Sequence, residues 1–88
     1  MSFELFITET AQEEIRKKLD KSLKYRFDKR IQKLKEAPDA YGKPLRWPLD
    51  GTWEIRFENR WRVYYEIDFN KKIVQITGFK HKDETKHS

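Results

Sequence analysis

The sequence has 88 residues, room for one small domain, and 40% of them are charged against 36% hydrophobic. Thirteen aromatic residues supply large apolar areas, so the composition favours a folded domain over a disordered chain. The absence of cysteine excludes a disulfide scaffold and thiolate metal sites, and no apolar run is long enough to span a membrane. A formal charge of +5 indicates a polyanionic partner, for which nucleic acid, an acidic protein and an anionic membrane surface remain open.

The N-terminal part of the chain predicts one strand followed by two helices. Residues 3–7 form a short, mostly apolar run that is typical of a strand. Apolar residues then recur at helical spacing over residues 11–19 and again over residues 23–34. Thr8 and Thr10 are the candidate N-caps, and Thr10 stands at capping-box spacing from a glutamate. Because so few residues separate the two helices, we expect an antiparallel helical hairpin.

Residues 38–52 contain all three prolines and two of the three glycines, which predicts a loop that ends the second helix. Beyond the loop the apolar residues alternate with polar ones, as in half-buried strands. We expect these strands over residues 53–58, 61–68 and 73–79, with tight turns at residues 59–60 and 70–71.

The resulting element order, β-α-α-β-β-β, predicts an α+β fold in which a two-helix hairpin packs on one face of an antiparallel sheet. We expect one domain over residues 1–88, with a flexible tail over residues 82–88. No internal repeat and no second domain is expected.

Strand alternation predicts a polar sheet face opposite the helices. If Trp53, Ile55 and Phe57 face the helices, the other face carries the charged residues and one tyrosine of two neighbouring strands: Glu54, Arg56, Glu58, Arg62, Tyr64, Glu66 and Asp68. Ordinary cross-strand ion pairs would explain this pattern equally well.

A second charged group lies near the C-terminus, where His81 stands just past the last expected strand between Lys80 and Lys82. Arginines and lysines with a nearby imidazole suit phosphodiester chemistry, because cations stabilise a pentavalent phosphate and imidazole exchanges protons near neutral pH. Basic residues are also concentrated in residues 23–43, with seven basic against three acidic side chains, although a solvated helix face would explain that cluster. No metal-ligand spacing, nucleotide-binding glycine motif or serine triad is present.

Three stretches together resemble the RelE/ParE toxin superfamily. They are Gly42–Leu45, the strand Leu-Asp-Gly-Thr-Trp-Glu-Ile-Arg-Phe at residues 49–57, and the strand Trp-Arg-Val-Tyr-Tyr-Glu-Ile at residues 61–67. A last strand that leads into a basic, histidine-containing end at residues 76–82 completes the likeness. The arginine and tyrosine at positions 62 and 65 are its most specific part.

The resemblance implies the RelE-like toxin of a type II toxin–antitoxin pair, a ribosome-dependent endoribonuclease that cleaves translated mRNA through the message's own 2′-hydroxyl. Arg62 and Arg56 would then hold the scissile phosphate, His81 would be the general acid and Glu54 the base. The residues expected to hold the RNA backbone are Lys43, Arg46, Lys80 and Lys82. The C-terminal tyrosine of several relatives is absent.

The resemblance also implies a cytoplasmic protein without a cofactor or a membrane partner, whose partners are mRNA on the ribosome and a small, acidic antitoxin. An apolar loop (Leu45, Trp47, Leu49) and the helical hairpin are the expected antitoxin surfaces, unless Trp47 caps the core. Two alternatives remain open at this point. One is a ParE-like toxin that binds DNA gyrase and has no nuclease activity, and the other is a catalytically decayed RNA- or ribosome-binding module.

Overall fold

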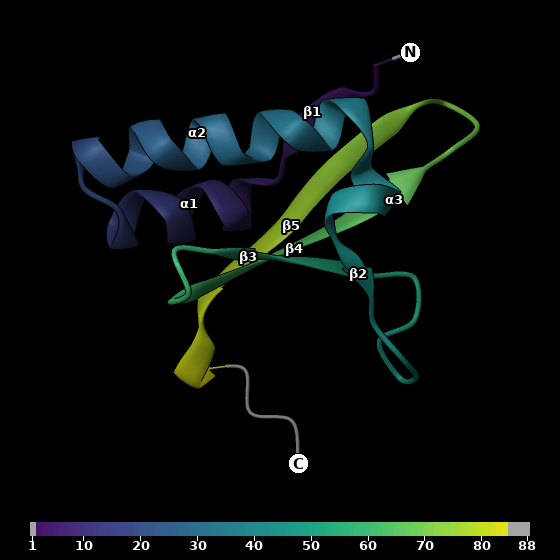
Figure 1. Ribbon diagram of the computed structural model, residues 1–88. Helices are drawn as coiled ribbons and strands as arrows, with labels where there is room; N and C mark the ends of the chain where they lie inside the picture. The colour runs from purple at the N-terminus through teal and green to yellow at the C-terminus, as the bar shows by residue number, and fades with distance from the viewer. Residues whose placement is uncertain (1, 85–88) are drawn as a thin grey trace.

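The computed structural model describes residues 2–84, in which two helices lie over one face of a five-stranded sheet (Figure 1). The elements in chain order are β1 (Glu4–Ile7), α1 (Glu9–Lys18), α2 (Lys21–Glu36), α3 (Pro38–Tyr41), β2 (Lys43–Pro44), β3 (Trp53–Phe57), β4 (Trp61–Asp68), β5 (Ile73–His81) and the 3₁₀ helix η1 (Lys82–Glu84). The predicted α+β fold with a helical hairpin on a sheet is confirmed. No helix among the described residues is long and apolar enough to cross a membrane.

The sheet has the strand order β1-β5-β4-β3-β2. Strands β2 to β5 pair in antiparallel fashion, as expected, but β1 pairs with the first half of β5 in parallel, with Glu4 opposite Ile73 and Ile7 opposite Ile76. The expectation of a purely antiparallel sheet is therefore wrong at one edge. Parallel strands need a long crossover, and here the helices and the other three strands supply it.

Side chains cap the two long helices at their N-termini. The Thr8 hydroxyl accepts a hydrogen bond from the Ala11 amide at 3.2 Å, and the Asp20 carboxylate accepts one from the Leu23 amide at 2.8 Å. Thr10 lies inside α1, so its assignment as a cap was wrong. A cap works only from a non-helical residue, and Thr8 is the one with extended backbone angles.

The proline-rich segment over residues 38–52 is only partly a loop. Pro38 begins the short helix α3, because its fixed backbone angle suits the first helical position. Lys43 and Pro44 then pair with β3 as the edge strand β2. The rest is a loop closed by a 2.9 Å hydrogen bond from the Leu45 amide to the Thr52 carbonyl oxygen. Trp47 on this loop is 84% exposed, so it does not cap the core.

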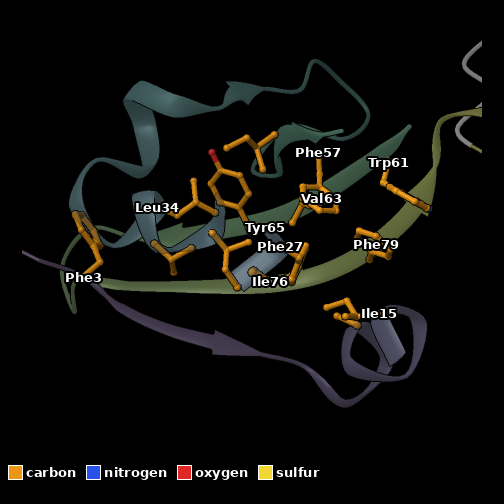
Figure 2. Packing of buried hydrophobic residues seen from close by; sticks show 14 residues of the cluster. Phe3, Ile15, Phe27, Leu34, Phe57, Trp61, Val63, Tyr65, Ile76 and Phe79 are labelled. Atoms are coloured by element: carbon orange, nitrogen blue, oxygen red, sulfur yellow. The ribbon is translucent and has the colours of Figure 1, made fainter. Parts of the chain in front are cut away.

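The core lies between the helices and the inward face of the sheet (Figure 2). Phe27 of α2 makes edge-to-face contacts with Phe57 and Phe79, each with ring centroids 5.4 Å apart. Tyr65 is fully buried, and its hydroxyl donates a 2.7 Å hydrogen bond to the Pro38 carbonyl oxygen. Burial raises the pKa of this phenol, so Tyr65 acts as a neutral structural residue. The alternate residues of β3 and β4 are left to form the outer face of the sheet.

The chain beyond β5 is held in place as far as the structure describes it. Glu84 of η1 accepts hydrogen bonds from the Lys18 ammonium at 2.7 Å and from the His81 amide at 3.0 Å. Residues 82–84 of the expected flexible tail thus form a 3₁₀ helix that contacts α1 through Glu84 and Lys18. Residues 85–88 lie outside the described part of the chain.

Candidate active site

Three cations form a row across the outer face of the sheet. Arg62 of β4 lies directly opposite Arg56 of β3 on one side and Lys80 of β5 on the other. Directly opposed residues of antiparallel strands point to the same face, with their Cβ atoms about 5 Å apart. The backbone thus places the three side chains as neighbours on one face of the sheet.

A β-bulge in β5 is what brings Lys80 into this row. Tyr64 pairs with Gly78, whereas Tyr65 pairs with Ile76, so Thr77 has no partner of its own in β4. Strict alternation from Ile76 onward would point position 80 toward the helices. The extra residue reverses the alternation, so that Phe79 is fully buried and Lys80 reaches the outer face.

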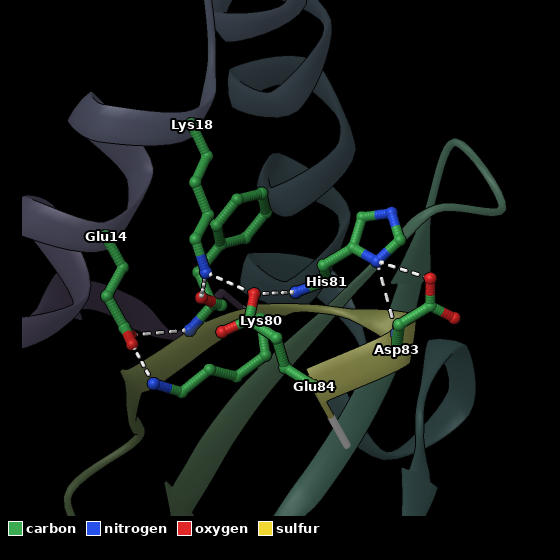
Figure 3. A network of polar contacts seen from close by, with 7 residues as sticks. Glu14, Lys18, Lys80, His81, Asp83 and Glu84 are labelled. Carbon is green, nitrogen blue, oxygen red and sulfur yellow. Dashed lines mark hydrogen bonds and ion pairs between the residues drawn. The ribbon is translucent and has the colours of Figure 1, made fainter. Parts of the chain in front are cut away.

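Two carboxylates hold cations of the row. Glu54 accepts a 2.8 Å hydrogen bond from an Arg62 Nη atom, with the two side chains 14% and 25% exposed. Glu14, which projects from α1, accepts hydrogen bonds from the Lys80 ammonium and, at 3.0 Å, from the Phe79 amide (Figure 3). The bond to Glu14 raises the pKa of Lys80, which keeps this side chain cationic at neutral pH.

Glu14 had not been identified from the sequence, which showed only an acidic residue beside the apolar stripe of α1. Its position follows from the tertiary structure, because β1 pairs with β5 only as far as Ile76 and leaves the edge of β5 open beyond it. Helix α1 lies beside this open edge of β5. The Glu14 carboxylate accepts a hydrogen bond from the Phe79 amide, which would otherwise be free to pair with a further strand.

Of the other residues that the sequence analysis assigned to RNA binding or to the outer face, only some lie beside the row. Lys43 pairs with Glu54 across the β2–β3 ladder and therefore joins the same face. Arg46 is on the exposed loop beyond β2, and Lys82 is in η1, where its amide donates to the Arg60 carbonyl oxygen at 2.7 Å. Glu58 is in the β3–β4 turn and forms an ion pair with Arg26 of α2 at 3.4 Å, so its assignment to the outer face was wrong.

His81 is not brought to the row of cations. It is the last residue of β5 rather than a residue beyond it, and it lies directly opposite Trp61, whose side chain faces the core. The imidazole packs edge-on against the Trp61 ring, and its Nδ1 atom accepts a 3.2 Å hydrogen bond from the Asp83 amide. The expected placement of His81 beside the arginines is thus contradicted, because the bulge sends Lys80 outward and the next residue inward.

Replacement of this histidine should have little effect on the chemistry of the outer face. We expect His81→Gln to lower any catalytic rate of the outer face by far less than the 10²–10⁴-fold that a general acid typically contributes, because the imidazole packs against Trp61 on the core side. The measurement is the rate of the purified variant in the assay used for the unsubstituted protein. A loss of rate of 10²-fold or more in a folded variant would restore His81 as the acid.

The arrangement suits a phosphate diester. Three cationic residues lie side by side across neighbouring strands, and a carboxylate is hydrogen-bonded to the central arginine. Cations in such an arrangement can stabilise the negative charge that develops on a phosphate. Within residues 2–84, no group of three or more histidine and carboxylate side chains is placed to bind a metal ion.

Residues 5–85 match the family described as the ParE toxin of the type II toxin–antitoxin system parDE. No curated protein sequence matches the chain significantly.

Several solved structures have a similar fold. A chain of the toxin–antitoxin complex RelBE2 from Mycobacterium tuberculosis is 28% identical, with 93% of this chain and 100% of that chain covered and a TM-score of 0.81. A variant of the E. coli toxin RelE in the free state is 22% identical, over 97% and 88% of the two chains, with a TM-score of 0.76. The YoeB/ParE toxin from Agrobacterium tumefaciens is 17% identical, over 90% and 98%, also with a TM-score of 0.76.

Proposed function

Since the chain belongs to the ParE toxin family of the RelE/ParE superfamily, and is thus the toxin of a type II toxin–antitoxin system, we propose that it is an endoribonuclease that cleaves mRNA on the ribosome. The observation that carries the proposal is the row of Arg56, Arg62 and Lys80 beside Glu54. A gyrase-binding surface has no need of such an arrangement, whereas the cleavage of a phosphodiester does.

In the proposed reaction the 2′-oxygen of the message attacks the adjacent phosphorus, and the bond from phosphorus to the 5′-oxygen breaks. Glu54 takes the proton from the 2′-hydroxyl, and the departing 5′-oxygen takes a proton from water. The products are a 2′,3′-cyclic phosphate on one fragment and a 5′-hydroxyl on the other, and the hydroxide left from the water takes the proton held by Glu54. Arg62, the central cation, contacts the phosphate and stabilises the extra negative charge of the transition state. Because Arg62 holds Glu54 at 2.8 Å, base and phosphate ligand are kept side by side.

The neighbouring cations would align the RNA. Arg56 and Lys80 flank the phosphate in register, and the raised pKa of Lys80 suits it to electrostatic stabilisation rather than to proton donation at neutral pH. Lys43, Arg46 and Lys82 would contact the backbone on either side. The ribosome supplies the positioning of the substrate, so the toxin itself needs few contacts with the bases.

The partner that restrains this activity would be a cognate antitoxin of acidic character. Two surfaces offer it apolar residues for docking. One is a groove of about 750 Å³ beside α1 and α2, lined in part by Ile7, Leu19 and Tyr25. The other is the loop after β2, on which Trp47 is 84% and Leu49 43% exposed.

The decisive experiment mixes the purified protein with ribosomes that are translating a defined message and maps the new RNA ends. The proposal requires cuts within the translated region that depend on the ribosome, and ends that carry a cyclic phosphate. Intact message in the presence of bound protein would favour the decayed binding module instead.

A gyrase-binding toxin is the second candidate, because the family description that matches the chain is that of ParE. A supercoiling assay with purified DNA gyrase separates the two. Inhibition of gyrase without cleavage of message would replace the proposed function, while cleavage without inhibition would support it.

A further inference from the structure

A basic groove runs between α2 and the hairpin that joins β3 to β4. It has a volume of about 570 Å³, and five of the residues that line it are basic: Arg26, Lys29, Arg30, Lys33 and Arg56. Glu58, paired with Arg26 at 3.4 Å, is the one carboxylate among the lining residues. We call this feature the α2 groove. Its charge is thus almost entirely positive.

Helical spacing explains why the cations gather on one side. Residues 26, 29, 30 and 33 are three or four positions apart, so they share one face of α2. The acidic residue in the middle of this helix, Asp28, lies on the other flank, where it pairs with Lys24 at 2.8 Å. The charges of the groove are therefore not neutralised by their own helix.

Several of these cations are held in position by neighbouring groups. Arg30 donates a 3.1 Å hydrogen bond from Nε to the Arg56 carbonyl oxygen, a contact that does not use the Nη atoms. The ammonium groups of Lys29 and Lys33 lie over the rings of Tyr25 and Tyr41, at 4.7 and 5.6 Å from the centroids. A ring face neutralises no charge, so both lysines keep their donors for a ligand.

The α2 groove and the row of cations share one residue, Arg56. Strand β2 pairs with β3 only at Trp53 and Glu54, which leaves the edge of β3 open at Arg56. Arg56 lines the groove and also lies opposite Arg62 in the row. A charged polymer that leaves the row over Arg56 would reach α2 around this edge of β3, where Arg30 contacts the Arg56 carbonyl oxygen.

We propose that the α2 groove binds RNA phosphodiester backbone outside the cleavage site. The inference rests on the proposed function in that the ligand is RNA. A ridge of cations about one helical turn apart, with a single carboxylate, suits a polymer with regularly repeated negative charge and no cations of its own. The backbone has two sources, the message beyond the scissile phosphate or the ribosomal RNA, and both present the same chemistry.

The test compares two double variants of α2 with equal loss of charge. Lys29→Gln/Lys33→Gln removes two cations of the groove, and Lys21→Gln/Lys24→Gln removes two from the opposite flank. The measurement is the binding of a short oligouridylate by fluorescence anisotropy over a range of salt concentrations. About 0.7 counterions are released for each phosphate that a cation neutralises on a single strand. Because the groove variant lacks two lysines, the slope of log K against log salt should become less negative by about 1.4. The control variant should change it little.

Three results would overturn the proposal. They are an unchanged slope in the groove variant, an equal drop in both variants, and a groove variant that loses binding to polyglutamate while it still binds the oligouridylate. The last result would assign the groove to an acidic protein. Unchanged circular dichroism and melting temperature show that both variants are folded.

The outcome is independent of whether the protein cleaves RNA. The same slopes are measured in the Arg62→Ala background. There the proposal requires the two groove substitutions to reduce the magnitude of the slope of log K against log salt by about 1.4, even if cleavage is never detected. Sedimentation with ribosomes that carry no message then distinguishes the sources. Loss of co-sedimentation in the groove variant assigns the groove to ribosomal RNA, and retained co-sedimentation with weakened oligouridylate binding assigns it to the message.

Discussion

Arg62→Ala should lower the rate of ribosome-dependent message cleavage by about 10²–10³-fold, the usual cost of removing one preorganised donor to a developing negative charge. The substitution removes the central cation of the row and the hydrogen-bond partner of Glu54. Cleavage is measured in single turnover with the protein in excess over programmed ribosomes, so that binding and chemistry can be separated.

The matched control is Arg60→Ala, since Arg60 is exposed in the turn before β4 and lies against the Trp61 ring, away from the row. Both variants lose one arginine, but only the first should lose cleavage. Loss of the Arg62–Glu54 ion pair should cost about 1 kcal/mol of unfolding free energy, so a melting curve must accompany the assay. Cleavage that is undiminished in Arg62→Ala, or lost equally in Arg60→Ala, would contradict the assignment of Arg62.

Gly42→Ala should lower the unfolding free energy by about 3 kcal/mol, at the upper end of the usual cost of overpacking. A Cβ atom at this position would come within 1.8 Å of the Tyr65 hydroxyl oxygen and 2.9 Å of the Glu54 carbonyl oxygen. The Tyr65 hydroxyl cannot easily move away, because the ring is fully buried and the hydroxyl is bonded to the Pro38 carbonyl oxygen. For a domain of this size the melting temperature should fall by about 15 °C.

Gly78→Ala is the control for this prediction. A Cβ atom there would find its nearest neighbour, a ring carbon of Tyr64, at 3.5 Å, an ordinary contact distance. Tyr65→Phe in the Gly42→Ala background should recover part of the lost stability, since it removes the atom of closest approach. Equal melting temperatures for the two glycine variants would show that Gly42 is not a packing requirement.

The strands of the C-terminal half were predicted from the sequence almost residue for residue. Trp53–Phe57 and Trp61–Asp68 alternate between core and outer face as their pattern indicates, with Ile55, Phe57, Val63 and Tyr65 buried. The amphipathic helices were equally predictable; in α2, for example, the buried residues Phe27, Ile31 and Leu34 repeat at helical spacing. Both signals are local: they depend on which face of one element is apolar, and every residue needed to recognise them lies within a few positions.

The contacts that complete the site are not local. Thr77 has no sequence feature that marks it as the bulged residue, yet the bulge decides that Lys80 joins Arg62 and that His81 does not. Glu14 is 66 residues from Lys80 in the chain, and only the open edge of β5 brings the two together. A pattern of period two carries no information on register, so an error of one residue exchanges the two faces of a strand.

The sequence by itself therefore determined the family, the order of the main elements and the identity of Arg62, Arg56 and Glu54 as neighbours on adjacent strands. Only the tertiary structure decided that Lys80 joins the row and is held by Glu14, that the basic residues of α2 form a groove with Arg56, and that His81 lies on the core side. The physical reason is the separation along the chain of the residues that interact. Strand alternation and helical periodicity depend on which side chains of a single element are buried. Strand register, bulges and the capping of a sheet edge depend on backbone hydrogen bonds between elements that are far apart in the sequence.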